Sequence, residues 1–361
     1  MRLLYACLER IVPGTAAATH VREICEGLTR RGVSVELLAE EGGRRGGGLA
    51  DQLRRYGRVL GAACLALPRS DVVYLRSHFA GYPLALLARL LGRPVIHEIN
   101  GAYDDAFVTH PGFRRVRGLL SAMQRAQYRR ARALVAVTPN LAAWGAREAG
   151  HGRVHVVTNA ADTARFRPDG PRAERARPYA LFFGGLVRWH GVDTMLAAAA
   201  LPDWPGGLDL VIAGPIVDRS LAPLIEAAPP RVAWIGPQPQ EALPALIRGA
   251  AACLVPISDP SGRSSHGVMP LKLFEALACG TPVVATDLAG QADLVRAGGC
   301  GLVVRPDDPE ALARAVADLA SDPEGARRMG EAGARLVAAE HSWDTRAEET
   351  YRILEEIMRR A

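Results

Sequence analysis

Short apolar runs alternate along the chain with longer segments whose apolar residues recur at helical spacing. In the first half the apolar runs are residues 2–8, 33–39, 71–76, 94–99, 133–137 and 154–157, and in the second half they are 179–183, 207–214, 231–236, 252–257, 281–287 and 300–304. Runs that are apolar on both faces indicate parallel strands covered by helices. The pattern therefore predicts an α/β fold built from Rossmann-like, doubly wound parallel sheets.

The length of 361 residues is more than one ordinary domain needs. The Arg- and Pro-rich stretch 167–178 interrupts the alternation, so we expect an N-terminal domain over 1–175 and a C-terminal domain over 176–341. Residues 342–361 form one more amphipathic helix, which we expect to pack back on the first domain. Two such domains whose strand carboxyl ends face a central cleft would bind a ligand there.

The composition is that of a globular protein, with 49% hydrophobic and 23% charged residues. No apolar run approaches the roughly 18 residues of a membrane span, and the start reads as a strand rather than a signal peptide, so we expect a cytoplasmic protein. Residues 1–177 carry 28 Arg against 15 acidic residues (+13), whereas 178–361 carry 16 basic against 23 acidic residues (−7). The basic half suggests an anionic partner. No nucleic-acid-binding motif accompanies it, so we expect no nucleic acid partner.

Cysteine and histidine spacing gives no sign of a metal centre. The six cysteines are far apart, and no HExxH motif or close Asp-x-Asp pair occurs. Asp104 and Asp105 are adjacent, so on a strand they would point to opposite faces. We therefore predict buried thiols, no bound metal and no cofactor.

The segment 264–284, SSHGVMPLKLFEALACGTPVV, contains Lys272, the single lysine among 44 Lys and Arg residues. Pro270 suits the first position of a helix and Gly280 its end. Lys272 and Glu275 lie three residues apart and share a face at the amino end of this helix, where free N–H groups favour an anion. A surface ion pair worth roughly 0.2–0.5 kcal/mol is the plain alternative. A lysine in the first turn opposes the helix dipole, however, which favours a phosphate site.

Five segments resemble the nucleotide-sugar-dependent glycosyltransferases of family 4, retaining enzymes of the glycosyltransferase-B architecture. They are residues 13–38, 131–144, 154–168, 184–196 and, most specifically, MPLKLFEALACGTPVVATD at 269–287. The resemblance implies that Glu275 holds the ribose hydroxyls, and that the loop Gly267–Val268–Met269 presents backbone amides to the diphosphate and sugar. It also implies that Lys272 neutralises the leaving diphosphate without a metal.

The chain departs from the common family pattern at three places. Gly267 replaces the first of two glutamates, which puts the donor sugar in doubt. Gly185 and His190 stand where many members have phosphate-binding arginine and lysine, so the chain resembles the branch with Trp189, His190 and a glycine in sequence. His190 is expected to donate to a phosphate oxygen in its charged form, or to cap the helix that begins near Val192.

In the first half, Asn100 falls where the family often has a histidine near the reacting carbon, and Glu98 shares its strand face. The resemblance places both in the cleft as catalytic residues. His97 points the other way, as a core residue. The loop Gly14–Thr15–Ala16 follows the first strand, and its amides would contact the acceptor or form a tight turn.

Gln238 follows a strand end and is assigned to the nucleobase. His20 is left without a role, and Asn159 is assigned to a structural turn. The Arg-rich segment 113–133 would rest on an anionic membrane surface or form an ordinary solvated helix.

Taken with the resemblance, which implies a retaining enzyme, these residues predict a metal-independent retaining transferase. Lys272, His190, Asn100 and Glu98 are its expected catalytic residues, the donor is a nucleoside-diphosphate sugar, and the acceptor is a saccharide, a lipid-linked sugar or a small molecule. A nucleotide-sugar epimerase of related fold would need further acid–base carboxylates. A nucleotide-sugar-binding module without chemistry is the non-enzyme alternative.

Overall fold

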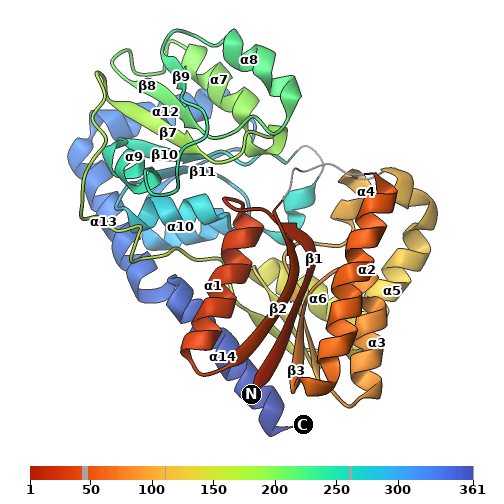
Figure 1. The fold of residues 1–361 in the computed structure, drawn as a ribbon. Helices are drawn as coiled ribbons and strands as arrows, with labels where there is room; N and C mark the ends of the chain where they lie inside the picture. The colour runs from red at the N-terminus through yellow and green to blue at the C-terminus, as the bar shows by residue number, and fades with distance from the viewer. Residues whose placement is uncertain (43–47, 110, 260–261, 361) are drawn as a thin grey trace. The chain divides into compact units, whose positions relative to one another are not determined.

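The computed structural model describes residues 1–42, 48–109, 111–259 and 262–360. The chain divides into two compact units (Figure 1). Unit 1 comprises Met1–Thr158 together with Trp343–Ala361, and unit 2 comprises Asn159–Ser342. Each unit is built on its own parallel six-stranded sheet, as the alternating pattern predicts.

The sheet of unit 1 has the strand order β2-β1-β3-β4-β5-β6. Its strands are β1 (Arg2–Ile11), β2 (Ser34–Glu41), β3 (Val72–Arg76), β4 (Val95–Ile99), β5 (Ala133–Ala136) and β6 (Val154–Val156). The central strands β3, β4 and β5 are buried along their whole length. The chain first adds β2 on one side of β1 and then β3 on the other, so the switch point of this sheet lies between β1 and β3.

Helices cover the faces of this sheet (Figure 1). They are α1 (Ala16–Arg30), α2 (Leu49–Ala66), α3 (Tyr82–Leu90), α4 (Asp105–Thr109), α5 (Arg117–Arg130), α6 (Pro139–Ala149) and α14 (Trp343–Arg359). Capping residues mark the ends of some of these helices. For α6, the Thr138 side chain accepts a hydrogen bond from the Leu141 amide, and Gly150 ends the helix with φ 66°.

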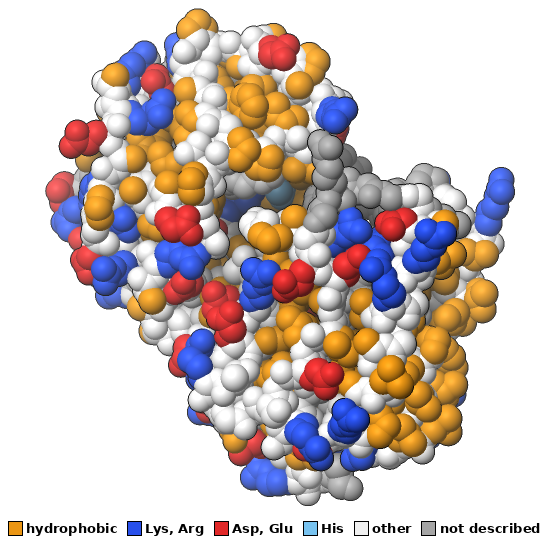
Figure 2. Space-filling model, in the orientation of Figure 1, with side chains coloured by type: hydrophobic (Ala, Val, Ile, Leu, Met, Phe, Trp, Pro, Cys, Tyr) orange, Lys and Arg blue, Asp and Glu red, His pale blue; other side chains and the backbone are white. Residues whose placement is uncertain are grey.

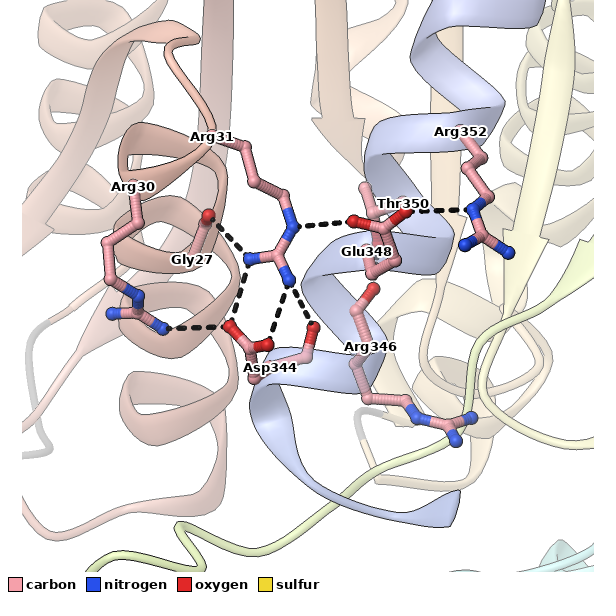
Figure 3. Close-up of polar contacts among 8 residues, drawn as sticks. All are labelled: Gly27, Arg30, Arg31, Asp344, Arg346, Glu348, Thr350 and Arg352. Atoms are coloured by element: carbon pink, nitrogen blue, oxygen red, sulfur yellow. Dashed lines mark hydrogen bonds and ion pairs between the residues drawn. The ribbon is translucent and has the colours of Figure 1, made fainter. Parts of the chain in front are cut away.

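The C-terminal helix α14 packs against α1 within unit 1 (Figure 3). The Arg31 guanidinium donates to the Asp344 carboxylate at 3.0 Å and to the Glu348 carboxylate at 2.9 Å. A Cβ on Gly27 would collide with Ala347, so the helices approach closely at this glycine. The last residues of the chain thus complete the first unit.

The sheet of unit 2 has the strand order β12-β11-β10-β7-β8-β9. Its strands are β7 (Tyr179–Phe183), β8 (Asp209–Ala213), β9 (Val232–Trp234), β10 (Ala252–Val255), β11 (Val283–Thr286) and β12 (Gly301–Val304). Strands β8 and β9 extend the sheet on one side of β7, and β10 to β12 extend it on the other. The switch point therefore lies between β7 and β10.

Both faces of the unit 2 sheet are buried under helices. These are α7 (Val192–Ala200), α8 (Ala222–Glu226), α9 (Leu243–Gly249), α10 (Leu271–Ala278), α11 (Gln291–Gly298), α12 (Pro309–Ser321) and α13 (Pro323–Glu340). Alternate residues of β7 serve different faces: Leu181 packs in the cluster that contains α10, and Phe182 packs in the cluster that contains α7 and α12. The doubly wound prediction holds for this half as well.

The boundary between the units differs from the predicted one at 175/176. Residues from Asn159 onward belong to unit 2 because they bond and pack there. Phe166 is buried in the unit 2 core, and the Arg248 guanidinium donates to the carbonyls of Arg167 and Pro171. The Arg- and Pro-rich stretch is thus part of the surface of unit 2, since its carbonyls are fixed by a side chain of α9.

Among the residues that the structure describes, no helix combines the length and the apolar character needed to cross a membrane.

Candidate functional site

Two loops meet at the switch point of the unit 2 sheet, and the one after β7 is rich in glycine. Gly184, with φ 123°, follows β7, and the loop after it continues to Gly191, with φ 68°. A Cβ on Gly191 would collide with the Pro256 carbonyl, just after β10, and the Ser258 amide donates to the Trp189 carbonyl at 3.0 Å. The loop after β7 is therefore held directly against the loop after β10, where doubly wound sheets bind ligands.

Helix α10 presents its first turn to this place. It begins at Leu271, because Pro270 has an extended ψ of 149° and serves as the cap rather than as the first helical residue. Gly280, with φ 75°, follows its end as predicted. The apolar stripe predicted for this helix, Leu271, Phe274, Leu277 and Ala278, is buried in the core.

Lys272 reaches from this first turn to the end of β7. Its side chain is 7% exposed, and its Nζ lies 4.0 Å from the centroid of the Phe182 ring. A Cβ on Gly184 would stand in van der Waals contact with Nζ, at 3.4 Å, and the φ of 123° at this position favours glycine. Within the described residues Nζ has no hydrogen-bond partner. Burial lowers the pKa of Lys272 to about 7, although Glu275 opposes the shift.

Glu275 lies one helical turn after Lys272 and is half-buried. Burial raises the pKa of Glu275 to about 7, against the lowering effect of Lys272 and Arg165. The described part of the chain gives its carboxylate no ion pair or hydrogen bond. A basic and an acidic group, both near neutrality in pKa and both lacking a fixed partner, thus stand together at the sheet's switch point.

The His190 side chain is bonded within its own loop. Its Nδ1 lies 2.6 Å from the Gly185 carbonyl, so this nitrogen carries the ring proton. Burial and the nearby Lys272 hold the pKa of His190 well below its usual value, although the Gly185 carbonyl opposes the shift. This shift favours the neutral ring, whose Nε2 is then an acceptor. Trp189, 42% exposed, packs on it with ring centroids 4.0 Å apart.

The loop before α10 is predicted to present its backbone amides to a diphosphate, and the structure shows which of its backbone groups are already bonded within the protein. Gly267 has φ 81°, a conformation that favours glycine. The Val268 amide donates to the Ala289 carbonyl at 2.9 Å, so it is not available to a diphosphate. Met269 is buried, and its carbonyl accepts from the Asn159 side chain at 2.8 Å. Asn159 is thus structural, because it fixes the loop in front of the helix.

Gln238 lies on the loop after β9. Its Nε2 donates to the Ile235 carbonyl at 2.7 Å, so this half of the amide is bound to its own loop. A contact with a nucleobase would have to use its Oε1 or replace that bond.

In unit 1 the predicted residues belong to a buried polar cluster near the switch point of the sheet. Glu98 is 1% exposed and accepts from Arg76 at 2.6 Å, from Asn100 at 2.5 Å and from the Tyr5 hydroxyl at 2.9 Å; His20 Nε2 lies 3.2 Å away. Burial alone would raise the pKa of Glu98, but His20, Arg76 and Asn100 together hold it well below the usual range.

This geometry corrects the assignment of Glu98 as a group that meets the substrate. A carboxylate with four partners and no exposed surface orients its neighbours, which makes it a positioning residue. Arg76 was missed by sequence reasoning because nothing in the strand 71–76 marks an arginine as buried. His20 received no role from the sequence, yet its ring also packs edge-on against Trp343 at 5.3 Å.

The loop Gly14–Thr15–Ala16 forms the start of α1. The Thr15 hydroxyl donates to the Val12 carbonyl at 2.7 Å and accepts from the Ala18 amide at 3.4 Å, which makes it the helix cap. Gly14, with φ 78°, is exposed. His97 faces the opposite side of β4 from Glu98 and is fully buried, as predicted for a core residue.

Over the described residues, no group of three or more His, Cys, Asp or Glu side chains is placed to hold a metal ion. At the unit 2 site the charged groups are one ammonium and one carboxylate, which suit a phosphate and a pair of hydroxyls respectively.

Two family models match the chain. Residues 17–165 match Glycosyltransferase Family 4, and residues 166–336 match Glycosyl transferases group 1. A D-inositol 3-phosphate glycosyltransferase from Streptomyces avermitilis is 30% identical over 312 residues, which cover 78% of this chain and 64% of that protein. An alpha-maltose-1-phosphate synthase from Mycolicibacterium smegmatis is 33% identical over 232 residues, covering 57% of each. The chain thus spans less than two thirds of the length of these curated relatives.

Solved structures agree on the fold. A sucrose-phosphate synthase from Thermosynechococcus elongatus superposes with a TM-score of 0.79 at 19% identity, over 100% of this chain and 99% of that one. Anabaena HepE in complex with UDP gives a TM-score of 0.74 at 15% identity, over 99% of this chain and 100% of that one. The two family models together take in residues 17–336, and the chain belongs to the glycosyltransferases of the glycosyltransferase-B fold, with Family 4 sequence in its first half and group 1 sequence in its second.

Proposed function

We propose that the protein is a metal-independent retaining glycosyltransferase that uses a nucleoside-diphosphate sugar as donor. The observation that carries the proposal is the Lys272 ammonium, buried without a hydrogen-bond partner among the described residues at the switch point of unit 2. A buried lysine without an anion is costly, and its lowered pKa expresses that cost. A bound diphosphate removes it.

The first turn of α10 adds to this effect. Its free N–H groups and the positive end of the helix dipole favour an anion at the position that Lys272 reaches. A charge that develops on the leaving diphosphate would meet donors that are already oriented, so little reorganisation is needed as the bond breaks. Lys272 is the assigned catalytic residue of unit 2.

Glu275 is assigned to the ribose. A carboxylate accepts two hydroxyl hydrogen bonds, and one helical turn separates it from the ammonium that binds the diphosphate. Its raised pKa falls when hydroxyl donors bind the charged form, so the nucleotide and the ionised carboxylate stabilise each other.

The transfer step needs no separate protein base. The bond between the anomeric carbon and the diphosphate oxygen breaks with its electron pair going to the diphosphate. The acceptor oxygen bonds the anomeric carbon on the same face, and the acceptor proton passes to the leaving phosphate oxygen. A neutral His190 beside Gly185 suits this scheme, because it orients the loop after β7 without competing for the proton.

Asn100 is assigned to the acceptor side as the exposed end of the Glu98 cluster, since it is half-buried while Glu98 is not exposed. Gly14, Thr15 and Ala16 follow β1, the strand whose Tyr5 hydroxyl donates to Glu98, and are assigned to the same acceptor region. The relatives' names include an inositol phosphate and a sugar phosphate, so small phosphorylated polyols and sugars are the first acceptors to test.

We also assign a peripheral contact with anionic membrane to unit 1, as a property separate from catalysis. Its support is an exposed apolar area with arginines nearby: Leu65 on α2 is 80% exposed and Leu90 on α3 is 74% exposed. Figure 2 shows hydrophobic side chains gathered over α2 and α3. Apolar residues beside basic ones suit an interfacial position.

The function is tested by ligand binding and product release. Nucleoside diphosphates and their sugars, beginning with UDP and UDP-glucose, are screened by thermal shift; a ligand at a hundred times its dissociation constant stabilises by about 2.7 kcal/mol. Positive donors then enter an assay for nucleoside diphosphate release with and without acceptors. Release that depends on an acceptor supports transfer, whereas conversion of the donor alone into an isomeric sugar nucleotide would identify an epimerase instead.

A further inference from the structure

A cavity of about 480 Å³ lies at the amino ends of the unit 1 strands, away from the carboxyl ends that carry Glu98 and Asn100. Pro94 and Val95 line it where β4 begins, and Arg132 lines it just before β5. Helices α3 and α5 supply further walls. Its volume falls within the roughly 300–1,000 Å³ of small-molecule pockets.

Arginine dominates the charge of this cavity. The described residues of its walls include no Asp or Glu but six arginines, Arg89, Arg93, Arg130, Arg132, Arg153 and Arg360. Of these, only Arg360 has a carboxylate partner among the described residues, at 2.8 Å from Glu356. Arg93 and Arg132 donate instead to the backbone carbonyls of Pro68 and Arg360. The positive charge that faces the cavity is therefore largely uncompensated.

Two buried polar side chains of the walls lack partners. His97 is fully buried, and neither of its ring nitrogens has a hydrogen-bond partner in the described residues. Gln127 is 3% exposed, and its Oε1 is likewise without a donor. Native proteins satisfy nearly all buried polar atoms, so unsatisfied atoms that line a cavity indicate that a ligand or bound water completes them.

We propose that this arginine cavity, defined by the six arginines with His97 and Gln127, binds a compound that bears a phosphate or diphosphate group. A guanidinium group can donate two parallel hydrogen bonds to a pair of phosphate oxygens. Several guanidinium groups around one cavity therefore suit a ligand with several negative charges better than a ligand with one carboxylate. His97 and Gln127 add a neutral donor or acceptor each, which suits hydroxyl or ester oxygens next to the phosphate. The site is separate from the proposed donor site, which lies in unit 2.

The test uses inorganic diphosphate in isothermal titration calorimetry. The protein carrying Lys272→Ala serves as the starting background, because it removes the charge at the proposed donor site. Within it, the pair Arg130→Gln and Arg153→Gln removes two exposed arginines of the cavity, which should raise the Kd for diphosphate about tenfold or more. The pair Arg54→Gln and Arg69→Gln removes two exposed arginines elsewhere in unit 1 and is the matched control, with the same change in net charge.

The second arm separates a free phosphate compound from a lipid headgroup. The same variants are sedimented with phosphatidic acid vesicles and with phosphatidylcholine vesicles. The proposal is supported if the cavity pair of substitutions abolishes binding of diphosphate or phosphatidic acid while the control pair leaves it intact. Which of the two probes binds then shows whether the ligand is a free phosphate compound or a lipid headgroup. The proposal fails if neither probe binds, or if both pairs of substitutions weaken binding equally, because binding then follows net charge alone.

Discussion

The two units each bury charged groups near the switch point of their sheet, but they treat those charges in opposite ways. In unit 1, Glu98 is fully surrounded by Arg76, His20, Tyr5 and Asn100, and its pKa is held below the usual range. In unit 2, the ammonium of Lys272 has an aromatic ring beside it but no hydrogen-bond partner in the described chain, and its pKa is lowered. A satisfied buried charge holds a structure together, whereas an unsatisfied one leaves room for a ligand.

The largest expected effect is on the stability of unit 1. Glu98→Ala should lower the free energy of unfolding by about 3–5 kcal/mol, because among the described residues it leaves the buried Arg76 guanidinium with Glu9 as its one remaining charged partner. Urea denaturation measures the change. Glu9→Ala is the control, since Glu9 is 46% exposed on its side chain and its loss should cost about 1 kcal/mol or less. Equal effects of the two substitutions would contradict the positioning role of Glu98.

The role of Glu98 should also appear in the dependence of stability on pH. The lowered folded pKa of Glu98 means that its stabilisation is complete above the unfolded carboxyl value of 4.5 and is lost as the pH falls toward the folded value. The free energy of unfolding, measured between pH 6 and 3, should therefore fall more steeply with decreasing pH in the wild type than in Glu98→Gln. Parallel pH profiles would mean that other carboxylates dominate.

The next effect concerns turnover. Lys272→Ala should lower kcat by about a hundredfold, because a preorganised charge on the leaving group is lost. It should not lower stability, since the buried ammonium has no hydrogen-bond partner to lose within the described residues. Arg296→Gln, an exposed arginine paired with Asp287, is the control and should leave kcat unchanged. Unaltered turnover in Lys272→Ala would remove the residue from the mechanism.

The protonation of Lys272 can be observed directly, because the chain has a single lysine. Nuclear magnetic resonance of protein with labelled lysine should show one ammonium signal that titrates near pH 7 rather than 10.5. A bound nucleoside diphosphate should raise this midpoint by at least one pH unit, so that binding at pH 8.5 takes up a proton. An ordinary midpoint in the free protein would place the side chain in solvent.

The smallest effect is expected where a charge is only partly buried. Arg31→Ala removes the contacts of α1 with Asp344 and Glu348 on α14 and should cost about 1 kcal/mol, because both carboxylates are exposed. Hydrogen exchange of the α14 amides measures the local loss. Arg352→Ala, which removes a bond within α14 itself, should cost less. If Arg31→Ala lowered the free energy of unfolding by more than Glu98→Ala does, the expectation that buried charge pairs contribute more to stability than exposed ones would be wrong.

Much of the fold follows from local patterns. Each predicted apolar run contains or overlaps one of the twelve strands, because a strand that is buried on both faces needs apolar residues without interruption. The ends of α10 could be predicted almost as well, because Pro270 and Gly280 mark them to within about one residue. The boundary near 175 was wrong, since an Arg- and Pro-rich segment resembles a linker in sequence even when Arg248 fixes its carbonyls.

The site residues divide in the same way. The pairing of Lys272 with Glu275 on one helix face follows from their spacing. The neutrality of His190 does not, because it depends on burial and on the Gly185 carbonyl. The engagement of the Val268 amide likewise depends on Ala289, twenty-one positions further along the chain.

The two parallel sheets, the helix that carries Lys272 and the family to which the chain belongs could all be predicted before folding is considered, because periodicity, helix ends and short motifs are properties of neighbouring residues. Which buried charges find partners follows instead from contacts that form when the chain folds. Three of the four partners of Glu98 come from β1, α1 and β3 and lie up to 93 positions away, whereas the arginines of the cavity converge from helices, strand starts and the end of the chain. Whether a charge is paired depends on such distant neighbours, and this pairing separates a structural centre from a binding site.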